Sequence, residues 1–309
     1  MKRLLAVLCV MLCGCAASPV PVRVAKPFYN GKTAFSATID GINSSYSPFS
    51  AFVLPGEIVK VNATTPIRLY GVAGMARRLS PSRWEWRAPT SLGAYPMTLV
   101  SDLGQHMRVN VFVTAERKSL PHDYPMGRYP GLYMGHTSYA APKGFLLATE
   151  DMRDVRVSPH FTLGQFFCKQ PEGFPKYVIL RPQLLIKLET LLEKLNQKGV
   201  RTDGFVVMSG FRTPLYNEGL GQGQYSRHIY GDAADIFVDR NGDDVMDDLN
   251  GDGKLNRKDA AWLYDLAEKT AKSPAWRGLA GGIGEYEATD FHGPFVHIDA
   301  RGFEARWGR

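Results

Sequence analysis

Hydrophobic residues repeat with a period of two along the first half of this chain. In "MRVNVFV", Met107, Val109, Val111 and Val113 alternate with polar or opposite-face residues, as is typical of a half-buried strand. The runs "PGEIVKVNA" and "PIRLYGV" have the same character and are separated by turn residues. This spacing of short strands predicts a small β-sandwich over residues 35–115.

The pattern becomes mixed between residues 151 and 309. Leucines recur three or four positions apart in "RPQLLIKLETLLEKLNQKG", with Pro182 near its start and Gly199 at its end, which predicts a helix. "RKDAAWLYDLAEKTAK" predicts a second amphipathic helix, whereas "FVVMSGF", "DIFV" and "PFVHIDAR" predict strands. We therefore expect an α+β fold in two domains.

The segment between these two domains, residues 116–150, is rich in proline and glycine. This composition predicts a linker or an extended arm on the surface rather than a domain. His122 and His136 lie in it and are interpreted as loop histidines.

The chain begins with "MKRLLAVLCVMLCGC", a basic start followed by an apolar run and small residues. This pattern predicts a secretion signal over residues 1–15, because the apolar run is too short to remain in a bilayer. The ending "LCGC" resembles a bacterial lipoprotein cleavage box, which implies lipidation of Cys15 and a tether over residues 16–34. The alternative is an ordinary signal peptide cut nearby. Because no inner-membrane retention signal follows Cys15, we expect the protein to be anchored to the outer membrane and to face the periplasm of a Gram-negative bacterium.

Composition and charge narrow the possible partners. The chain has 44% hydrophobic and 22% charged residues, as globular proteins do. Its formal charge of +7 falls to +5 when Lys2 and Arg3 leave with the signal. The remaining excess forms no Lys/Arg block, which excludes a typical nucleic-acid-binding protein and suits an anionic polymer such as a cell wall. Only Cys15 and Cys168 would remain, so no disulfide framework is expected.

The stretch "YSRHIYGDAADI" carries two candidate metal ligands, His228 and Asp235. Seven residues span about 10.5 Å in a helix and about 23 Å in a strand, so the two can share an ion only if the chain turns back. Gly231 permits that reversal. A third candidate, His297, lies in the strand pattern "PFVHIDAR". Two histidines and a carboxylate form a catalytic zinc set, and zinc would activate water and polarise a carbonyl for amide hydrolysis.

Three ordered motifs carry a family resemblance. "SRHIYGDAAD" matches the S-x-H-x-x-G-x-A-x-D signature of the zinc D-alanyl-D-alanine peptidases, "VHIDAR" resembles their later H-x-D motif, and "SGFRTPLYN" resembles their S-G-[YF]-R-[TS]-x-x-x-N segment. This family shares its fold with hedgehog signalling domains and lysostaphin-type enzymes. The resemblance covers residues 151–309. It implies a small antiparallel sheet with flanking helices, and zinc on His228, Asp235 and His297.

The resemblance also implies roles for residues around the metal. Arg212 matches an arginine that contacts the substrate carboxylate or carbonyl, a task that suits a planar guanidinium; the alternative is a surface salt bridge. Ser226, which opens the signature, is assigned to substrate binding. His292 matches a second histidine of some bacterial members, which could donate to the oxyanion or shuttle a proton; the alternative is a loop histidine. His160 is interpreted as a cap or core residue.

One position departs from the family pattern: Pro294 stands where several relatives carry a catalytic Glu. The general base is therefore open among four carboxylates. Strand alternation favours Asp299, which it places on the metal side with His297, although Asp299 could equally orient a zinc histidine. The other candidates are Glu285, Glu287 and Asp290.

An acidic insertion over residues 239–259 contains a second metal signal. Residues 248–259 match a calcium loop through Asp248, Asn250, Asp252 and Gly253, with Asp259 at the twelfth position, where Glu is usual. We expect a structural Ca²⁺ that pins the insertion beside the active site. The alternative is a solvated acidic loop.

Together these features predict a lipid-anchored zinc peptidase that cleaves a bond next to a D-amino acid in peptidoglycan crosslinks or stem peptides. A lipid anchor and an additional β-domain suit a polymeric substrate. We therefore favour a crosslink-cleaving endopeptidase over a D-alanyl-D-alanine carboxypeptidase. The rival interpretation is a non-catalytic peptidoglycan-binding lipoprotein that retains the zinc fold. Trp84 and Trp86 are interpreted as packing residues, with sugar stacking as the alternative.

Overall fold

The computed structural model describes residues 28–170 and 173–309. The predicted signal peptide, Cys15 and residues 16–27 of the tether lie outside the described residues. Strands and helices are both present, which agrees with the predicted α+β composition. Within the described ranges, no helix combines the length and apolar character needed to cross a membrane.

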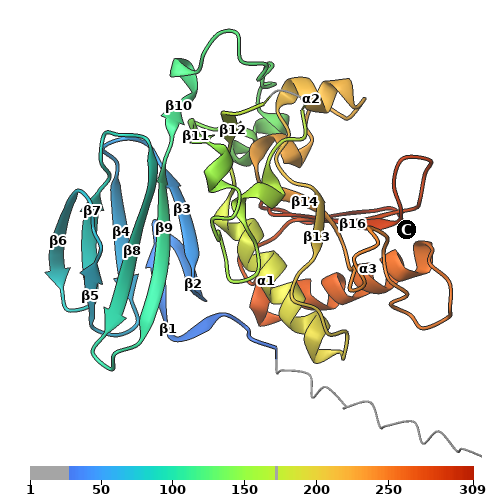
Figure 1. Ribbon diagram of the computed structural model, residues 1–309, viewed down its shortest axis with the longest axis horizontal. Helices are drawn as coiled ribbons and strands as arrows, with labels where there is room; N and C mark the ends of the chain where they lie inside the picture. Colours follow the sequence, from blue (N-terminus) through green and yellow to red (C-terminus); the bar gives the residue numbers. More distant parts are fainter. Residues whose placement is uncertain (1–27, 171–172) are drawn as a thin grey trace, which may run out of the picture.

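The N-terminal half consists of two sheets that face each other (Figure 1). The first has the order β2-β1-β4-β7-β6, with strands Ile42–Tyr46, Lys32–Ile39, Ile58–Ala63, Arg83–Arg87 and Met75–Ser80. The second has the order β3-β9-β8-β5, with strands Phe49–Val53, His106–Val113, Gly93–Ser101 and Ile67–Tyr70. Apolar side chains from both sheets form one core between them, as a sandwich requires.

The two tryptophans of β7 contribute to this core rather than to an exposed platform. Trp86 is fully buried, and its indole N–H donates to the carbonyl of Ala73 at 2.6 Å. Trp84 is half-buried and donates to the carbonyl of Ile67 at 3.3 Å. The packing interpretation is therefore favoured over sugar stacking.

The segment predicted as a linker contributes a buried strand to the C-terminal half. Strand β11 (Gly144–Ala148) pairs with β10 (Ala115–Glu116) and β12 (Lys176–Val178) in a three-stranded antiparallel sheet. Phe145 and Leu146 are fully buried in the same core as the C-terminal helices. Short 3₁₀ turns occupy Arg117–Ser119, Tyr133–Gly135 and Thr137–Tyr139. The interpretation of the whole of 116–150 as a surface arm is corrected accordingly.

The C-terminal half is built on a five-stranded sheet of order β13-β14-β16-β15-β17. Its strands are Val206–Ser209, Ala233–Phe237, Phe295–Asp299, Gly282–Tyr286 and Ala305–Trp307, and only the pair β15–β17 is parallel. The longer helices are α1 (Pro182–Gln197) and α3 (Arg257–Ala271), with a short α2 (Pro214–Gly219). Further 3₁₀ turns are Glu150–Met152, Leu163–Phe166, Arg227–Tyr230 and Pro274–Trp276.

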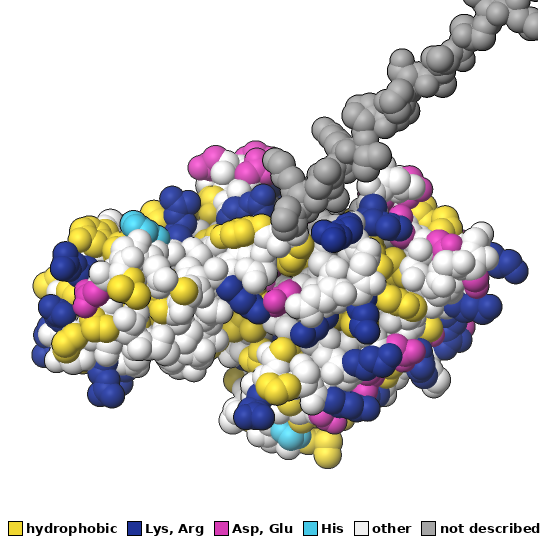
Figure 2. All heavy atoms as spheres, turned by 90° about the horizontal axis from the view of Figure 1, so that it is seen from below, with side chains coloured by type: hydrophobic (Ala, Val, Ile, Leu, Met, Phe, Trp, Pro, Cys, Tyr) yellow, Lys and Arg dark blue, Asp and Glu magenta, His cyan; other side chains and the backbone are white. Residues whose placement is uncertain are grey.

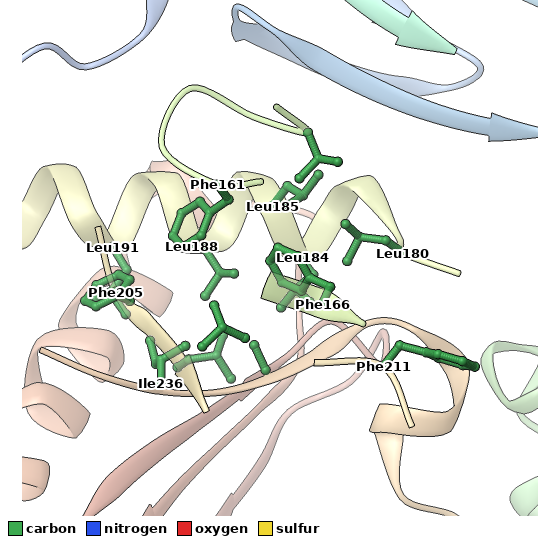
Figure 3. Packing of buried hydrophobic residues seen from close by; sticks show 14 of the residues in the cluster. Phe161, Phe166, Leu180, Leu184, Leu185, Leu188, Leu191, Phe205, Phe211 and Ile236 are labelled. Atoms are coloured by element: carbon green, nitrogen blue, oxygen red, sulfur yellow. The ribbon is translucent and has the colours of Figure 1, made fainter. Parts of the chain in front are cut away.

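Helix α1 covers one face of this sheet with its leucines. Leu184, Leu188 and Leu191 are fully buried and lie towards Phe205 and Ile236 (Figure 3). Because side chains alternate along a strand, residues next to Ile236 on β14 point to the opposite face. Helices α1 and α3, which contact each other, thus cover one side of the sheet and leave the other side for a site.

Helix α1 also lies against the N-terminal half, between the two parts of the molecule (Figure 1). Ile186 belongs to the core of the sandwich, and Thr190 Oγ1 lies 3.2 Å from the hydroxyl of Tyr46 on β2. On the same helix the buried carboxylate of Glu189 binds the half-buried His160 at its Nδ1, at 2.6 Å, and so holds His160 in a structural contact. Lys and Arg side chains are spread over the face shown in Figure 2 and form no single block.

Candidate metal centre and active site

The chain turns back between His228 and Asp235, as the spacing requires. His228 lies in the 3₁₀ turn Arg227–Tyr230, and Asp235 lies in β14. Gly231 between them has φ +72°, and a Cβ there would lie 2.3 Å from the carbonyl oxygen of Ile179. Glycine therefore supplies both the left-handed backbone and the space. The turn brings His228 Nε2 to 3.2 Å from Asp235 Oδ1.

His297 joins these two residues from the neighbouring strand. It stands directly opposite Asp235 in the ladder between β14 and β16, with its Nδ1 at 2.8 Å from Asp235 Oδ1. One donor atom from each of the three side chains lies within 4.8 Å of the others, and all three residues are buried. In the described part of the chain, this is the one group of three or more His, Cys, Asp or Glu side chains that converges in this way.

The second polar atom of each side chain is held by a buried partner. His228 Nδ1 lies 2.7 Å from the carbonyl of Gly210, so it carries the proton and leaves the Nε2 lone pair free. Asp235 Oδ2 accepts from Arg212 Nη2 at 2.6 Å, and His297 Nε2 lies 3.1 Å from Asp299 Oδ2. In metal sites of proteins, the ligating side chains are held by hydrogen-bonded partners of this kind. The donor set fits a divalent ion of the zinc type.

The charge states of this group also suit a metal. Burial lowers the pKa of His228, which keeps its imidazole neutral. Burial alone would raise the pKa of Asp235, but the neighbouring His228 and His297 hold that pKa well below its usual range. For His297, burial opposes protonation, while hydrogen bonds to Asp235 and Asp299 outweigh it and raise the pKa. A positive charge is thus favoured at the point where the three donor atoms meet.

Asp299 lies behind His297, on the side away from Asp235. Its fully buried carboxylate is bound by His297, by the guanidinium of Arg301 at 2.5 to 3.0 Å, and by the backbone N–H of Gly282 at 2.7 Å. These contacts agree with the orienting role that was left open and do not favour Asp299 as the general base.

The other three carboxylates differ in their access to the site. Glu285 is buried and paired with Arg257 and Arg309, and Glu287 is also paired with Arg257. Asp290 lines the cavity in front of the metal ligands. Asp290 is therefore the candidate base that the geometry places within the site.

Arg212 supports the metal site as well as lining the cavity. Its Nε donates to Ser209 Oγ at 2.7 Å, while its Nη2 holds Asp235. It is not a surface salt bridge, because the whole residue is only 9% exposed.

A cavity of about 1000 Å³ opens in front of the three ligands. Ser226 and His292 line it, as does the loop that carries Asp290. The ring of His292 packs edge-on against Phe295, and its Nδ1 lies 2.9 Å from the carbonyl of Gly293. The three candidate metal ligands thus border one space with Ser226 and His292, whereas Asp299 does not line it.

The sequence motifs do not single out two aromatic walls of this cavity, Tyr286 and Trp307. Trp307 on β17 stands opposite Gly284, where a Cβ would lie 2.3 Å from the indole ring. The ring also lies 5.1 Å from that of His297. The alternating glycines of "GGIGEY" are the sequence signal for this close approach.

The acidic insertion does not form the expected calcium cluster. Asp248 accepts backbone N–H groups of its own loop, including that of Gly253 at 2.7 Å. Asp259 is fully buried and accepts from the backbone of Asn256 in the capping box of α3. The carboxylates of Asp248, Asp252 and Asp259 do not bring three oxygens together, so the structure gives the calcium prediction no support.

Comparison with known proteins yields one family. No curated protein matches the chain. Residues 159–249 match the family model described as Peptidase M15, a segment that includes His228, Asp235, Arg212 and Ser226 but ends before His297. With the buried His–Asp–His group, this match supports the M15 zinc peptidase family for the C-terminal half.

Proposed function

We propose that this protein is a zinc-dependent peptidase that hydrolyses a peptide bond next to a D-amino acid in peptidoglycan. The observation that carries the proposal is the buried group of His228, Asp235 and His297, in which the outer atom of each side chain is already held. Zinc bound there would supply a Lewis acid and an activated water. The match of residues 159–249 to Peptidase M15 supports the same chemistry.

The surrounding residues supply orientation and proton transfer. Arg212 and Asp299 fix the ligands, so that the lone pairs of the donors stay directed at one point. Asp290 and His292 line the cavity and are the titratable groups from which we expect proton transfer. Ser226 borders the same space and is assigned to substrate binding.

We favour a crosslink-cleaving endopeptidase over a terminal carboxypeptidase. The main cavity measures about 1000 Å³, and a second hollow of about 330 Å³ adjoins it across Phe291 and His292. Two adjoining spaces suit the two peptides of a crosslink better than a single chain end. We further propose lipidation of Cys15 and an outer-membrane, periplasmic location, which would hold the enzyme next to its polymer.

The test is digestion of purified crosslinked muropeptides followed by mass analysis. We expect cleavage by the zinc-loaded protein, loss of cleavage on chelation, and recovery when zinc is restored. His228→Ala should abolish cleavage, whereas the control His122→Ala, at an exposed loop position, should not. Cleavage that survives both chelation and His228→Ala would overturn the proposal. Binding of intact muropeptides without cleavage would instead favour the non-catalytic alternative.

A further inference from the structure

We propose that Tyr286 is a catalytic hydrogen-bond donor to the substrate, an inference that rests on the proposed peptidase function. Tyr286 is the last residue of β15 and stands opposite Phe295 on β16. It lies two residues after Gly284, which is opposite His297. Since side chains alternate along strands, Tyr286 and His297 point to the same face of the sheet. Tyr286 lines the same cavity as the three metal ligands and is 37% exposed.

The position of the Tyr286 ring is fixed by packing. The ring stacks on that of Phe295 with centroids 4.4 Å apart and an interplanar angle of 9°. Its hydroxyl is bound by Trp307, whose ring is itself held between Gly284, His297 and the guanidinium of Arg301. A donor that is held in place before the substrate arrives needs little rearrangement during reaction.

The direction of this hydrogen bond leaves the Tyr286 proton available. The indole Nε1 of Trp307 lies 2.9 Å from the Tyr286 hydroxyl, and an indole N–H can only donate. The phenol oxygen is therefore the acceptor, and its own hydrogen can donate elsewhere. No acceptor for that hydrogen is found among residues 28–170 and 173–309. Because Tyr286 lines the cavity, this hydrogen can donate to a substrate bound there.

The chemistry of amide hydrolysis requires such a donor. Negative charge develops on the carbonyl oxygen as the bond is attacked, and a donor aimed at that oxygen stabilises the transition state. Burial raises the pKa of Tyr286 and outweighs the opposing effect of the hydrogen bond from Trp307, so the phenol remains protonated. Arg212 has its Nε and Nη2 engaged by Ser209 and Asp235. Another candidate donor, His292, lies on an irregular loop and has its Nδ1 beside the carbonyl of Gly293.

The experiment compares Tyr286→Phe with the wild-type enzyme on one purified muropeptide. Removing an oxyanion donor lowers kcat by about 10²- to 10³-fold in other hydrolases, and we expect a fall of that order with little change in KM. Zinc content, measured by mass spectrometry, should remain the same because Tyr286 touches no ligand. Affinity for a phosphinate analogue of the tetrahedral state should fall with kcat.

Two further variants separate catalysis from packing. Trp307→Phe removes the indole N–H, so kcat should fall, and the double variant should be no slower than Tyr286→Phe alone. The control Tyr95→Phe removes a hydroxyl that donates to Ser91 at 2.9 Å in the other half of the molecule, and kcat should not change.

The outcomes distinguish the inference from the function on which it rests. An active wild-type enzyme with unchanged kcat in Tyr286→Phe overturns the inference alone, as does a loss of zinc that accounts for the loss of rate. An inactive, zinc-loaded wild-type protein overturns both.

Discussion

Lys187 offers a test of the energetics of the helix between the two halves. It lies on α1, is 1% exposed, and its Nζ donates to the backbone carbonyl of Asp299 at 2.6 Å. Nζ also lies 4.2 Å from the centre of the Trp276 ring. Burial lowers the pKa of Lys187 from 10.5 to about 8, and this effect outweighs the opposing charge of Asp299.

The sign of the pH effect follows from the lowered pKa. Between pH 8 and 10.5 the unfolded chain keeps a proton on Lys187 that the folded protein has released, so stability rises with pH across this window. The difference between 10.5 and about 8 corresponds to about 3 kcal/mol. Below pH 8 the full cost of burying the charged amine is present.

We therefore predict that Lys187→Met removes this rise. The variant and the wild-type protein, both saturated with zinc, would be unfolded with urea at several pH values between 7 and 11. The difference in unfolding free energy should change by about 3 kcal/mol across the window. Tyr46, whose pKa is raised by burial, lowers stability above pH 10 in both proteins and so does not enter the difference. A difference that stays constant with pH would refute the reasoning.

Three further predictions concern the metal site and its turn. Asp299→Asn should weaken zinc binding by about 10- to 100-fold in a chelator competition, because the partner of a ligating histidine loses its charge. Arg212→Lys should also weaken zinc binding in that assay, since a lysine cannot hold both Ser209 and the Asp235 carboxylate as the guanidinium does. Gly231→Ala should cost more unfolding free energy than the control Gly221→Ala: both positions have positive φ, but only at Gly231 does a Cβ meet backbone, at 2.3 Å.

Local patterns were sufficient to predict the two longer helices of the C-terminal half and its strands β13, β14 and β16. The leucine spacing with Pro182 and Gly199 predicted a helix that the structure places at Pro182–Gln197. The strand that contains His297 was also predicted and is observed at Phe295–Asp299. In these segments, the hydrophobic periodicity and the residues at the ends of each element agree with the observed burial. Tertiary contacts therefore did not change the type of secondary structure that the sequence predicts.

The remaining features depend on contacts between distant segments. The apolar run "GFLLA" is too short to outweigh the prolines around it, and only its pairing with Lys176–Val178 makes it a core strand. Alternation placed Asp299 on the face of His297 but could not show which ring nitrogen it meets or that Arg301 occupies the same carboxylate. Glu285 is paired with Arg257 and Arg309, which are distant in sequence, so these pairs could be identified only once the fold was known.

The position of α1 has a consequence for any attempt to shorten this protein. The helix presents Ile186 and Thr190 to the sandwich, while Lys187 of the same turn donates to the backbone carbonyl of Asp299, two residues after the candidate ligand His297. Removal of the N-terminal half would uncover apolar surface on α1, next to Lys187, which contacts the strand that carries His297. We therefore expect that the C-terminal half is not a detachable module. A shortened protein would need polar substitutions on the side of α1 that carries Ile186 and Thr190 before it could fold without the N-terminal half.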